Sequence, residues 1–138
     1  MRYIALCLAL ATPASAWEFS SSPICSLSQN GKLVVEVTYD ASLPEYAIHL
    51  TRHEGWPPSP IFAIRFEGPF PLTIATDRHQ IKGNTLSVRD RGFGNVLRGM
   101  ARNVQAVAIL RNLEVPFSLD GAAPAVAEFR DCPSDLSV

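Results

Sequence analysis

Alternation of apolar and polar residues constrains the fold of this chain more than any other feature of its sequence. In LVVEVTY, residues 33–39, every second side chain is apolar, and residues 46–51 repeat the pattern as YAIHLT. The same period recurs in residues 62–66 and 114–119. Because successive side chains of a strand point to opposite faces, this period is typical of half-buried strands. Most of the chain is therefore predicted to form antiparallel β-structure.

Further strands are predicted from shorter patterns. Leu72 and Ile74 begin one, and residues 81–88 read as a hairpin that turns at Gly83-Asn84. Residues 104–110 are almost continuously apolar, which favours a strand in the centre of a sheet. Pro116 cannot donate a backbone hydrogen bond, so the last strand is expected at an edge.

Residues 89–103 break the period of two. Phe93, Val96, Leu97 and Met100 are spaced i, i+3, i+4 and i+7, which places them on one face of a helix. Asp90 precedes this face and is predicted to cap the helix. A first short helix is therefore expected here.

Residues 118–132, SLDGAAPAVAEFRDC, predict a second short helix. Asp120 is available as its cap, and Pro124 is tolerated in a first turn. The face expected to pack consists of Ala123, Val126, Ala127 and Arg130, with Phe129 beside it. The fold class predicted is mainly β: a single antiparallel β-sandwich-like domain with two short helices near its C-terminal end.

The N-terminus has the three parts of a secretory signal peptide. Met1-Arg2-Tyr3 supplies a basic start, residues 4–11 are apolar, and Ala14-Ser15-Ala16 gives a small-x-small ending. The apolar run is much shorter than the roughly 20 residues that span a bilayer. We therefore expect cleavage between Ala16 and Trp17 and a periplasmic or secreted domain, residues 17–138; the alternative is a buried first strand or helix.

Signal cleavage removes Cys7 and leaves Cys25 and Cys132, one near each end of the domain. Two cysteines in an oxidising compartment predict a single disulfide. The alternatives are two free buried thiols or a bond to another chain.

Composition argues against several classes of function. Twelve basic and 13 acidic residues give a net charge of −1, so nucleic-acid binding is disfavoured. No later apolar run suggests a membrane span, and no glycine-rich phosphate motif is present. The three histidines lack metal-ligand spacing. We expect no cofactor and no metal site, while a catalytic triad assembled across the fold stays open.

Two clusters are candidates for binding. Arg78, His79, Lys82, Arg89 and Arg91 flank the predicted hairpin and are candidates for a cationic patch that binds an anionic ligand or partner. The alternative is a solvated hairpin in which neighbouring aspartates neutralise these charges.

Trp56, in the proline-rich stretch EGWPPSP, is the second candidate. It is either an exposed binding aromatic on a stiff loop or a side chain folded over the edge of the core.

The C-terminal half, residues 72–130, resembles the invasion-associated locus B family of small exported bacterial proteins. In that family a strand near the end of the chain is followed by a phrase of the form sLxGfxxAl. Here Ser118-Leu119-Asp120-Gly121 and Ala125-Val126 hold the matching places. The resemblance implies a periplasmic β-sandwich-like domain with no established catalytic residues.

These features lead us to expect an exported, non-enzymatic domain that binds a partner protein or an envelope component. The alternative is a small exported hydrolase with a dispersed active site. A deep cleft that holds His79 or His53 against a carboxylate would favour the hydrolase.

Overall fold

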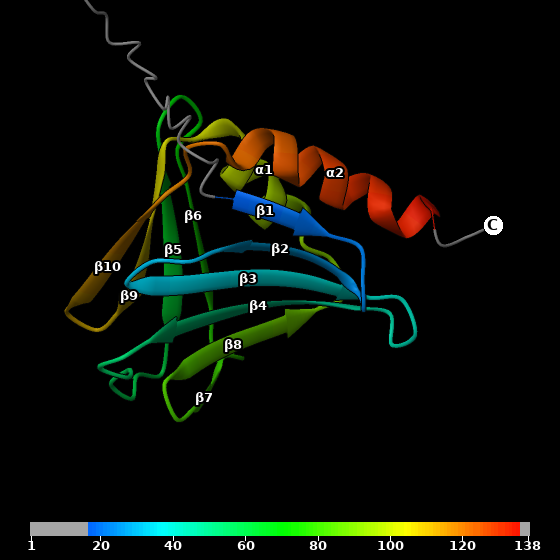
Figure 1. Cartoon of the computed structure of the whole chain (residues 1–138). Helices are drawn as coiled ribbons and strands as arrows, with labels where there is room; N and C mark the ends of the chain where they lie inside the picture. Colours follow the sequence, from blue (N-terminus) through cyan, green and yellow to red (C-terminus); the bar gives the residue numbers. More distant parts are fainter. Residues whose placement is uncertain (1–16, 136–138) are drawn as a thin grey trace, which may run out of the picture.

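Two antiparallel sheets packed together, with two helices in the C-terminal part, make up the fold (Figure 1). The computed structural model describes residues 17–135, so the predicted signal peptide lies outside the described residues. The predicted fold class, a mainly β, sandwich-like architecture, is confirmed.

The larger sheet has six strands in the order β1-β2-β3-β4-β8-β7. These strands are β1 (Trp17–Ser20), β2 (Cys25–Gln29), β3 (Leu33–Asp40), β4 (Glu45–Arg52), β8 (Thr85–Asp90) and β7 (Gln80–Lys82). The smaller sheet has four strands in the order β10-β9-β5-β6. They are β10 (Leu113–Ser118), β9 (Gln105–Leu110), β5 (Phe62–Glu67) and β6 (Leu72–Thr76). The helices are α1 (Gly94–Arg102) and α2 (Ala122–Asp135).

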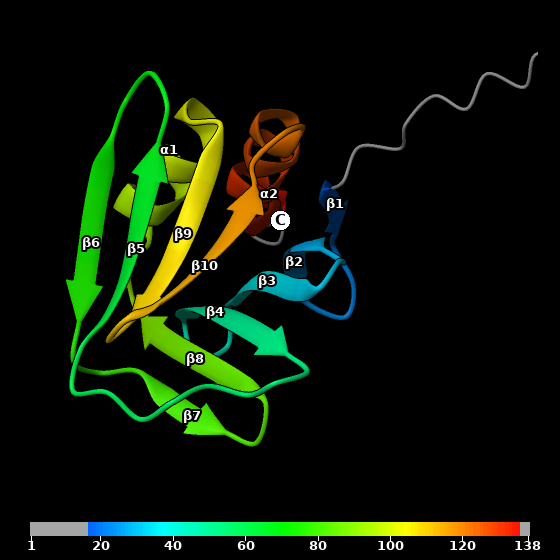
Figure 2. The same ribbon diagram turned by 90° about the vertical axis from the view of Figure 1, so that its left-hand side faces the viewer.

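The core lies between the two sheets, whose strands run across one another (Figures 1 and 2). The alternating apolar residues of β3 and β5 fill it: Val35, Val37, Phe62 and Phe66 are almost fully buried. Burial of one such side chain contributes about 1.5–3 kcal/mol, which is why the period of two determines the inward faces.

Most predicted strands are confirmed at nearly the predicted positions. The apolar run forms β9, which is central in its sheet, and the strand with Pro116 is the edge strand β10. The hairpin β7–β8 turns at Gly83, whose φ of 59° favours glycine. Strands β1 and β2 were not predicted from the sequence.

Helix α1 has the predicted apolar face: Phe93, Leu97 and Met100 are buried and Val96 is half-buried. The predicted cap is wrong. The N-cap is Phe93, which makes no side-chain capping bond, because Asp90 is the last residue of β8. The Asp90 carboxylate instead accepts hydrogen bonds from the Arg78 guanidinium and from the backbone N–H of Arg91.

Helix α2 buries a different face from the one predicted. Ala122, Ala125, Val126, Phe129 and Cys132 are buried, with a helical spacing. In contrast, the side chains of three residues of the predicted face are exposed: Ala123, Ala127 and Arg130. The reason is that α2 lies along β1, where the fully buried Phe129 packs into the core (Figure 1).

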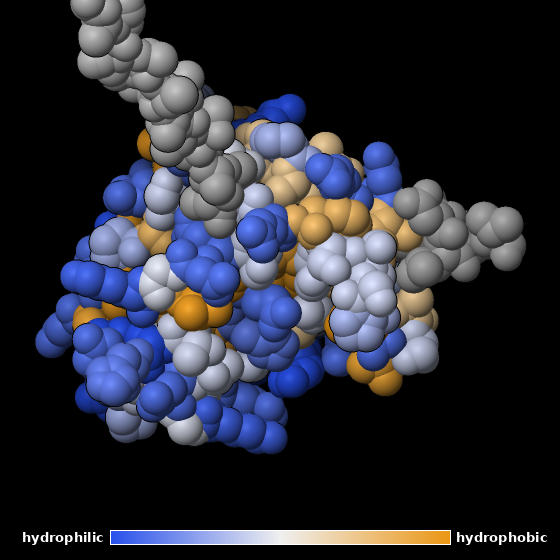
Figure 3. Space-filling model, viewed as in Figure 1, coloured by the Kyte–Doolittle hydropathy of each residue, from blue (hydrophilic) through white to orange (hydrophobic). Residues whose placement is uncertain are grey.

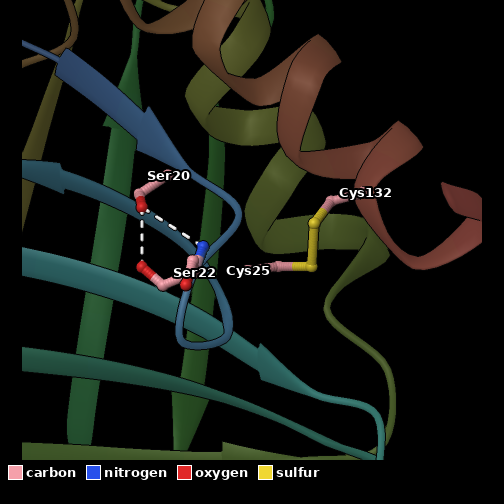
Figure 4. Close-up of a disulfide and its surroundings, with 4 residues drawn as sticks. All are labelled: Ser20, Ser22, Cys25 and Cys132. Atoms are coloured by element: carbon pink, nitrogen blue, oxygen red, sulfur yellow. Dashed lines mark hydrogen bonds between the residues drawn. A yellow bond between two sulfur atoms is a disulfide. The ribbon is translucent and has the colours of Figure 1, made fainter. Parts of the chain in front are cut away.

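The predicted disulfide is confirmed. Cys25 at the start of β2 is bonded to Cys132 in α2, and both are buried (Figure 4). Beside this bond, the Ser20 hydroxyl donates to the Ser22 carbonyl oxygen over 2.9 Å and accepts from its backbone N–H over 3.3 Å. The disulfide thus holds β2 against α2, and the hydrogen bonds of Ser20 and Ser22 stabilise the turn between β1 and β2.

Hydrogen bonds close one side of the sandwich. The carbonyl oxygen of Ser118 in β10 accepts from the Trp17 indole N–H over 3.1 Å and from the Gln29 side-chain amide over 3.0 Å. These bonds join the edge of the small sheet to β1 and β2. The opposite side of the sandwich, where β6 and β8 face each other, contains the candidate site.

Candidate functional site

A cleft of about 440 Å³ opens between the two sheets, and we call it the interlayer cleft. It is bounded by β6, by β8 and by the first turn of α1. Its apolar lining includes Phe62, Ile64, Ile74, Val88, Phe93 and Val96. The volume lies within the range of about 300–1,000 Å³ that is usual for small-molecule sites.

The cleft exists because β6 and β8 belong to different sheets and do not pair. Their inward side chains are therefore covered from only one side. Phe62 and Ile64 form a buried floor, whereas Ile74, Val88 and Val96 are half-buried along the walls. Half-buried aliphatic side chains from three separate elements thus surround an open space.

The rim of the cleft carries a guanidinium–carboxylate pair. A nitrogen of the Arg78 guanidinium lies 2.9 Å from an Asp90 carboxylate oxygen, with the two side chains 67% and 42% exposed. An exposed pair of this kind stabilises a fold by only about 0–1 kcal/mol. Arg78 can therefore exchange Asp90 for another anionic group at little cost.

The first turn of α1 adds positive potential to the same rim. Gly94, Asn95 and Val96 line the cleft, the N-cap Phe93 supplies no side-chain acceptor, and the first turn contains no acidic residue. The first N–H groups of a helix have no intrahelical partner and form its positive end. The rim combines these groups and the Arg78 guanidinium with a single carboxylate from residues 17–135, that of Asp90, so its net potential is positive and favours a further negative charge.

The structure does not bring the predicted cationic patch together. The Arg78 guanidinium bonds to Asp90 beside the cleft, whereas Arg91 donates to the same carboxylate through its backbone N–H. The side chain of Arg89 lies on the outer face of the six-stranded sheet, 3.9 Å from a Glu45 carboxylate oxygen. Lys82 pairs with Thr85 at the far end of the hairpin. Four strand residues, about 13 Å, separate this end from Arg89.

His79 faces the proline-rich loop rather than the cleft. Its Nε2 lies 2.9 Å from the Ser59 carbonyl oxygen, and its ring centroid is 6.1 Å from that of Phe62. Its Nδ1 is buried and makes no hydrogen bond within residues 17–135. His53 is exposed just after β4. Neither histidine lines the cleft, so the arrangement that would favour a hydrolase is not found there.

Trp56 is folded over the edge of the core, which was one of its two predicted roles. It is 8% exposed, and its indole N–H donates to the carbonyl oxygens of Leu50 and Asn84, 3.0 Å and 3.1 Å away. The Arg52 guanidinium lies 5.3 Å from the centroid of its ring. Trp56 therefore anchors the proline-rich loop and is not an exposed binding aromatic.

Sequence reasoning missed a polar group that crosses three strands. Glu36, His49 and Ser87 are cross-strand neighbours on β3, β4 and β8, and His49 Nδ1 lies 2.6 Å from the Ser87 hydroxyl oxygen. Burial lowers the pKa of His49; Arg89 adds to this effect, and Glu36 opposes it. Only the pairing of β8 with β4 reveals the group, and sequence patterns do not give that pairing.

This polar group lies on the outer face of the six-stranded sheet, whereas the interlayer cleft lies on its inner face. The side of the molecule seen in Figure 3, with β3, β4 and β8 in front, is coloured mainly as hydrophilic. We therefore read the His49–Ser87 bond as a structural cross-strand link on this outer face, where Ser87 is buried and His49 is half-buried.

Within residues 17–135, neither helix is long and apolar enough to cross a bilayer. In the same part of the chain, no three histidine, cysteine, aspartate or glutamate side chains converge as metal ligands would.

No family model, no curated protein and no solved structure matches the chain.

Proposed function

We propose that the chain is an exported, non-enzymatic binding domain that takes an apolar group with a nearby negative charge into the interlayer cleft. One observation carries the proposal. The half-buried side chains of Ile74, Val88 and Val96 surround a 440 Å³ space with Arg78 at its rim. The ligand is an envelope component or part of a partner protein, since these are what an exported domain meets.

The disulfide supports export, because such bonds persist in oxidising compartments outside the cytoplasm. The N-terminal pattern of residues 1–16 adds the expectation of signal cleavage and of a periplasmic or secreted location. The resemblance to the invasion-associated locus B family agrees with this assignment, since that family consists of exported domains without established catalytic residues.

The chemistry of the cleft favours binding over hydrolysis. The ionisable side chains that line it are Arg78 and Asp90, which bond to each other. A hydrolase needs a nucleophile or an activated water next to a general base. His49 and Ser87 are within hydrogen-bond reach of each other, but they lie on the other face of the sheet.

The apolar walls supply affinity and the rim supplies orientation. Each methylene group that leaves water for the cleft contributes about 0.8 kcal/mol. A chain of four methylenes thus contributes about 3 kcal/mol before the cost of immobilising the ligand. A negative group that contacts Arg78 and the start of α1 fixes which end of the ligand faces outward.

Titration calorimetry with 8-anilinonaphthalene-1-sulfonate tests the proposal, because this dye joins apolar rings to one sulfonate. The mature chain should bind one molecule saturably. Val96→Glu should weaken binding at least tenfold by placing a like charge in the cleft. A glutamate in the first turn of α1 favours the helix, so this variant should fold. Arg78→Gln should weaken binding several-fold.

Val104→Glu and Lys32→Gln are the matched controls. Val104 is 65% exposed and lies outside the cleft, and Lys32 is exposed in the turn before β3. Both controls should bind the dye as the unchanged chain does. Absence of saturable binding, or equal affinity in the two glutamate variants, would overturn the proposal.

A further inference from the structure

The two sheets have four edge strands, β1, β7, β10 and β6. An edge strand presents unpaired N–H and C=O groups to any extended chain that approaches it. Natural proteins guard such edges with charged residues, proline, short strands or a covering element. The four edges of this fold differ in how well they are guarded.

Three of the edges carry such guards. Strand β10 contains Glu114 and Pro116. Strand β7 is only three residues long and ends in Lys82. Strand β1 contains Glu18 and lies along α2 (Figure 1), and its Trp17 is tied to β10 through Ser118.

Strand β6 has none of these guards. Its five residues, LTIAT, are uncharged and contain no proline, and three of them are β-branched. It pairs only with β5, and Figure 2 shows it at the outer edge of its sheet, away from α2. Thr73 and Ala75 are exposed on its outer face. An uncharged edge of five residues without these guards favours strand addition.

The same edge borders the interlayer cleft, because Ile74, Ala75 and Thr76 are part of its lining. A strand added to β6 would point every second side chain toward the inner face of the sheet. Those side chains repeat about every 6.7 Å along the strand, and the five residues of β6 match an added segment about 17 Å long. Strand addition and occupation of the cleft are therefore compatible in one ligand.

We propose that β6 accepts an extended segment of a partner protein as a fifth strand of the smaller sheet. The segment runs antiparallel to β6. One apolar side chain of the segment enters the interlayer cleft, and an acidic residue near the N-terminal end of the segment contacts Arg78. This inference rests on the proposed function, since it identifies the cleft ligand as a protein segment. Main-chain hydrogen bonds supply affinity, and the cleft and Arg78 supply specificity.

A second copy of this chain fits the edge less well. Antiparallel pairing of β6 with its copy about Ile74 would place Phe70 of the second copy, not an acid, opposite Arg78. Charge complementarity with Arg78 therefore favours a partner segment with an acidic residue.

The test uses the synthetic peptide acetyl-ETVTVSVTK-amide, whose acid lies at the N-terminus on the same face as its valines, so that both point toward the cleft. It should bind the mature chain, and Thr73→Lys should weaken binding at least tenfold because a lysine guards the edge. Ala127→Lys, which adds the same charge at an exposed position of α2, should have no effect.

Two N-methylated peptides test the hydrogen bonding directly. In one peptide, the methyl groups replace the backbone N–H hydrogens that point to one edge of the extended peptide. In the other peptide, they replace the N–H hydrogens that point to the opposite edge. One of the two should lose binding and the other should keep it, because only one edge of the peptide pairs with β6. Equal binding of both peptides would overturn strand addition.

The dye separates this inference from the proposed function. Thr73→Lys should bind 8-anilinonaphthalene-1-sulfonate normally, whereas Val96→Glu should lose both dye and peptide. Normal peptide binding by Thr73→Lys overturns strand addition and leaves the cleft proposal standing. A dimer of the unchanged chain that Thr73→Lys dissociates in sedimentation analysis overturns the partner segment instead, because a second copy then occupies the edge. Dye binding that Val96→Glu does not weaken overturns the cleft proposal and, with it, the segment.

Discussion

The Cα atoms of Cys25 and Cys132 lie 6.1 Å apart although 107 residues separate them in the sequence. Their bond joins the start of β2 to α2 and encloses nearly the whole domain. Helix α2 contains Pro124, and isolated helices of this length are marginal in water. Packing against β1 and β2 and this covalent bond therefore hold the C-terminal helix in place.

Replacing both cysteines, Cys25→Ser with Cys132→Ser, should lower the free energy of unfolding by about 3–5 kcal/mol. Opening a loop of this length restores that much conformational entropy to the unfolded chain. Urea unfolding of the mature protein measures the change. Cys7→Ser is the control and should leave the mature protein unaltered. An unchanged unfolding midpoint in the double variant would show that the bond does not stabilise the fold.

Gly99 allows α1 to pack closely on β5. A Cβ atom at this position would lie 2.6 Å from the nearest atom of the Phe66 ring. Gly99→Ala should therefore destabilise the protein by about 1–3 kcal/mol, although alanine favours a helix by up to about 1 kcal/mol. Gly94→Ala is the control, because its Cβ meets no atom within 4 Å. Equal stability of the two variants would contradict this packing.

His49 should make stability depend on pH. Burial lowers its pKa below the usual value of about 6.5, so near that pH the unfolded chain binds more protons than the folded one. Its contribution is complete above about pH 6.5 and is lost as pH falls through the folded-state pKa. Thermal unfolding between pH 5 and 7 should show this loss, and His49→Gln should reduce it. His53→Gln, at an exposed position, should keep the original slope. An identical slope in all three proteins would argue against the burial of His49.

Export should leave Trp17 as the first residue of the mature protein. Trp17 is buried and donates a hydrogen bond to Ser118, so the residue predicted to begin the mature chain is an integral part of the fold. N-terminal mass spectrometry of the exported protein tests this prediction. Ala16→Glu should block processing and leave a precursor that is 16 residues longer. An exported protein that keeps Met1 would remove the signal-peptide assignment.

The fold was largely predictable because long strands with one buried face carry a period of two. Strands β1 and β2 were missed because they are short and stand next to serines and a proline. In β2 the inward residue Gln29 is polar, and it is buried because it donates to Ser118. The face of α2 was predicted wrongly because contact with β1, rather than helical spacing alone, determines how the helix is rotated.

The interlayer cleft was not predictable from the sequence. Its walls come from β6, β8 and α1, and alternation does not show that β8 pairs with β4 or that β6 ends a separate sheet. The cationic patch was expected because its members are close in sequence. In the fold, strand alternation sends Arg89 to the outer face, while Arg78 reaches Asp90 at the rim of the cleft.

Amide chemical shifts of the ¹⁵N-labelled mature protein, titrated with 8-anilinonaphthalene-1-sulfonate, test the central claim most directly. If the interlayer cleft is the binding site, the shifts that change at one equivalent should fall in residues 74–78 and 88–96, which line it or border it. Shifts that change instead around His49 and Ser87 on the outer sheet face, or that do not saturate, would contradict the account.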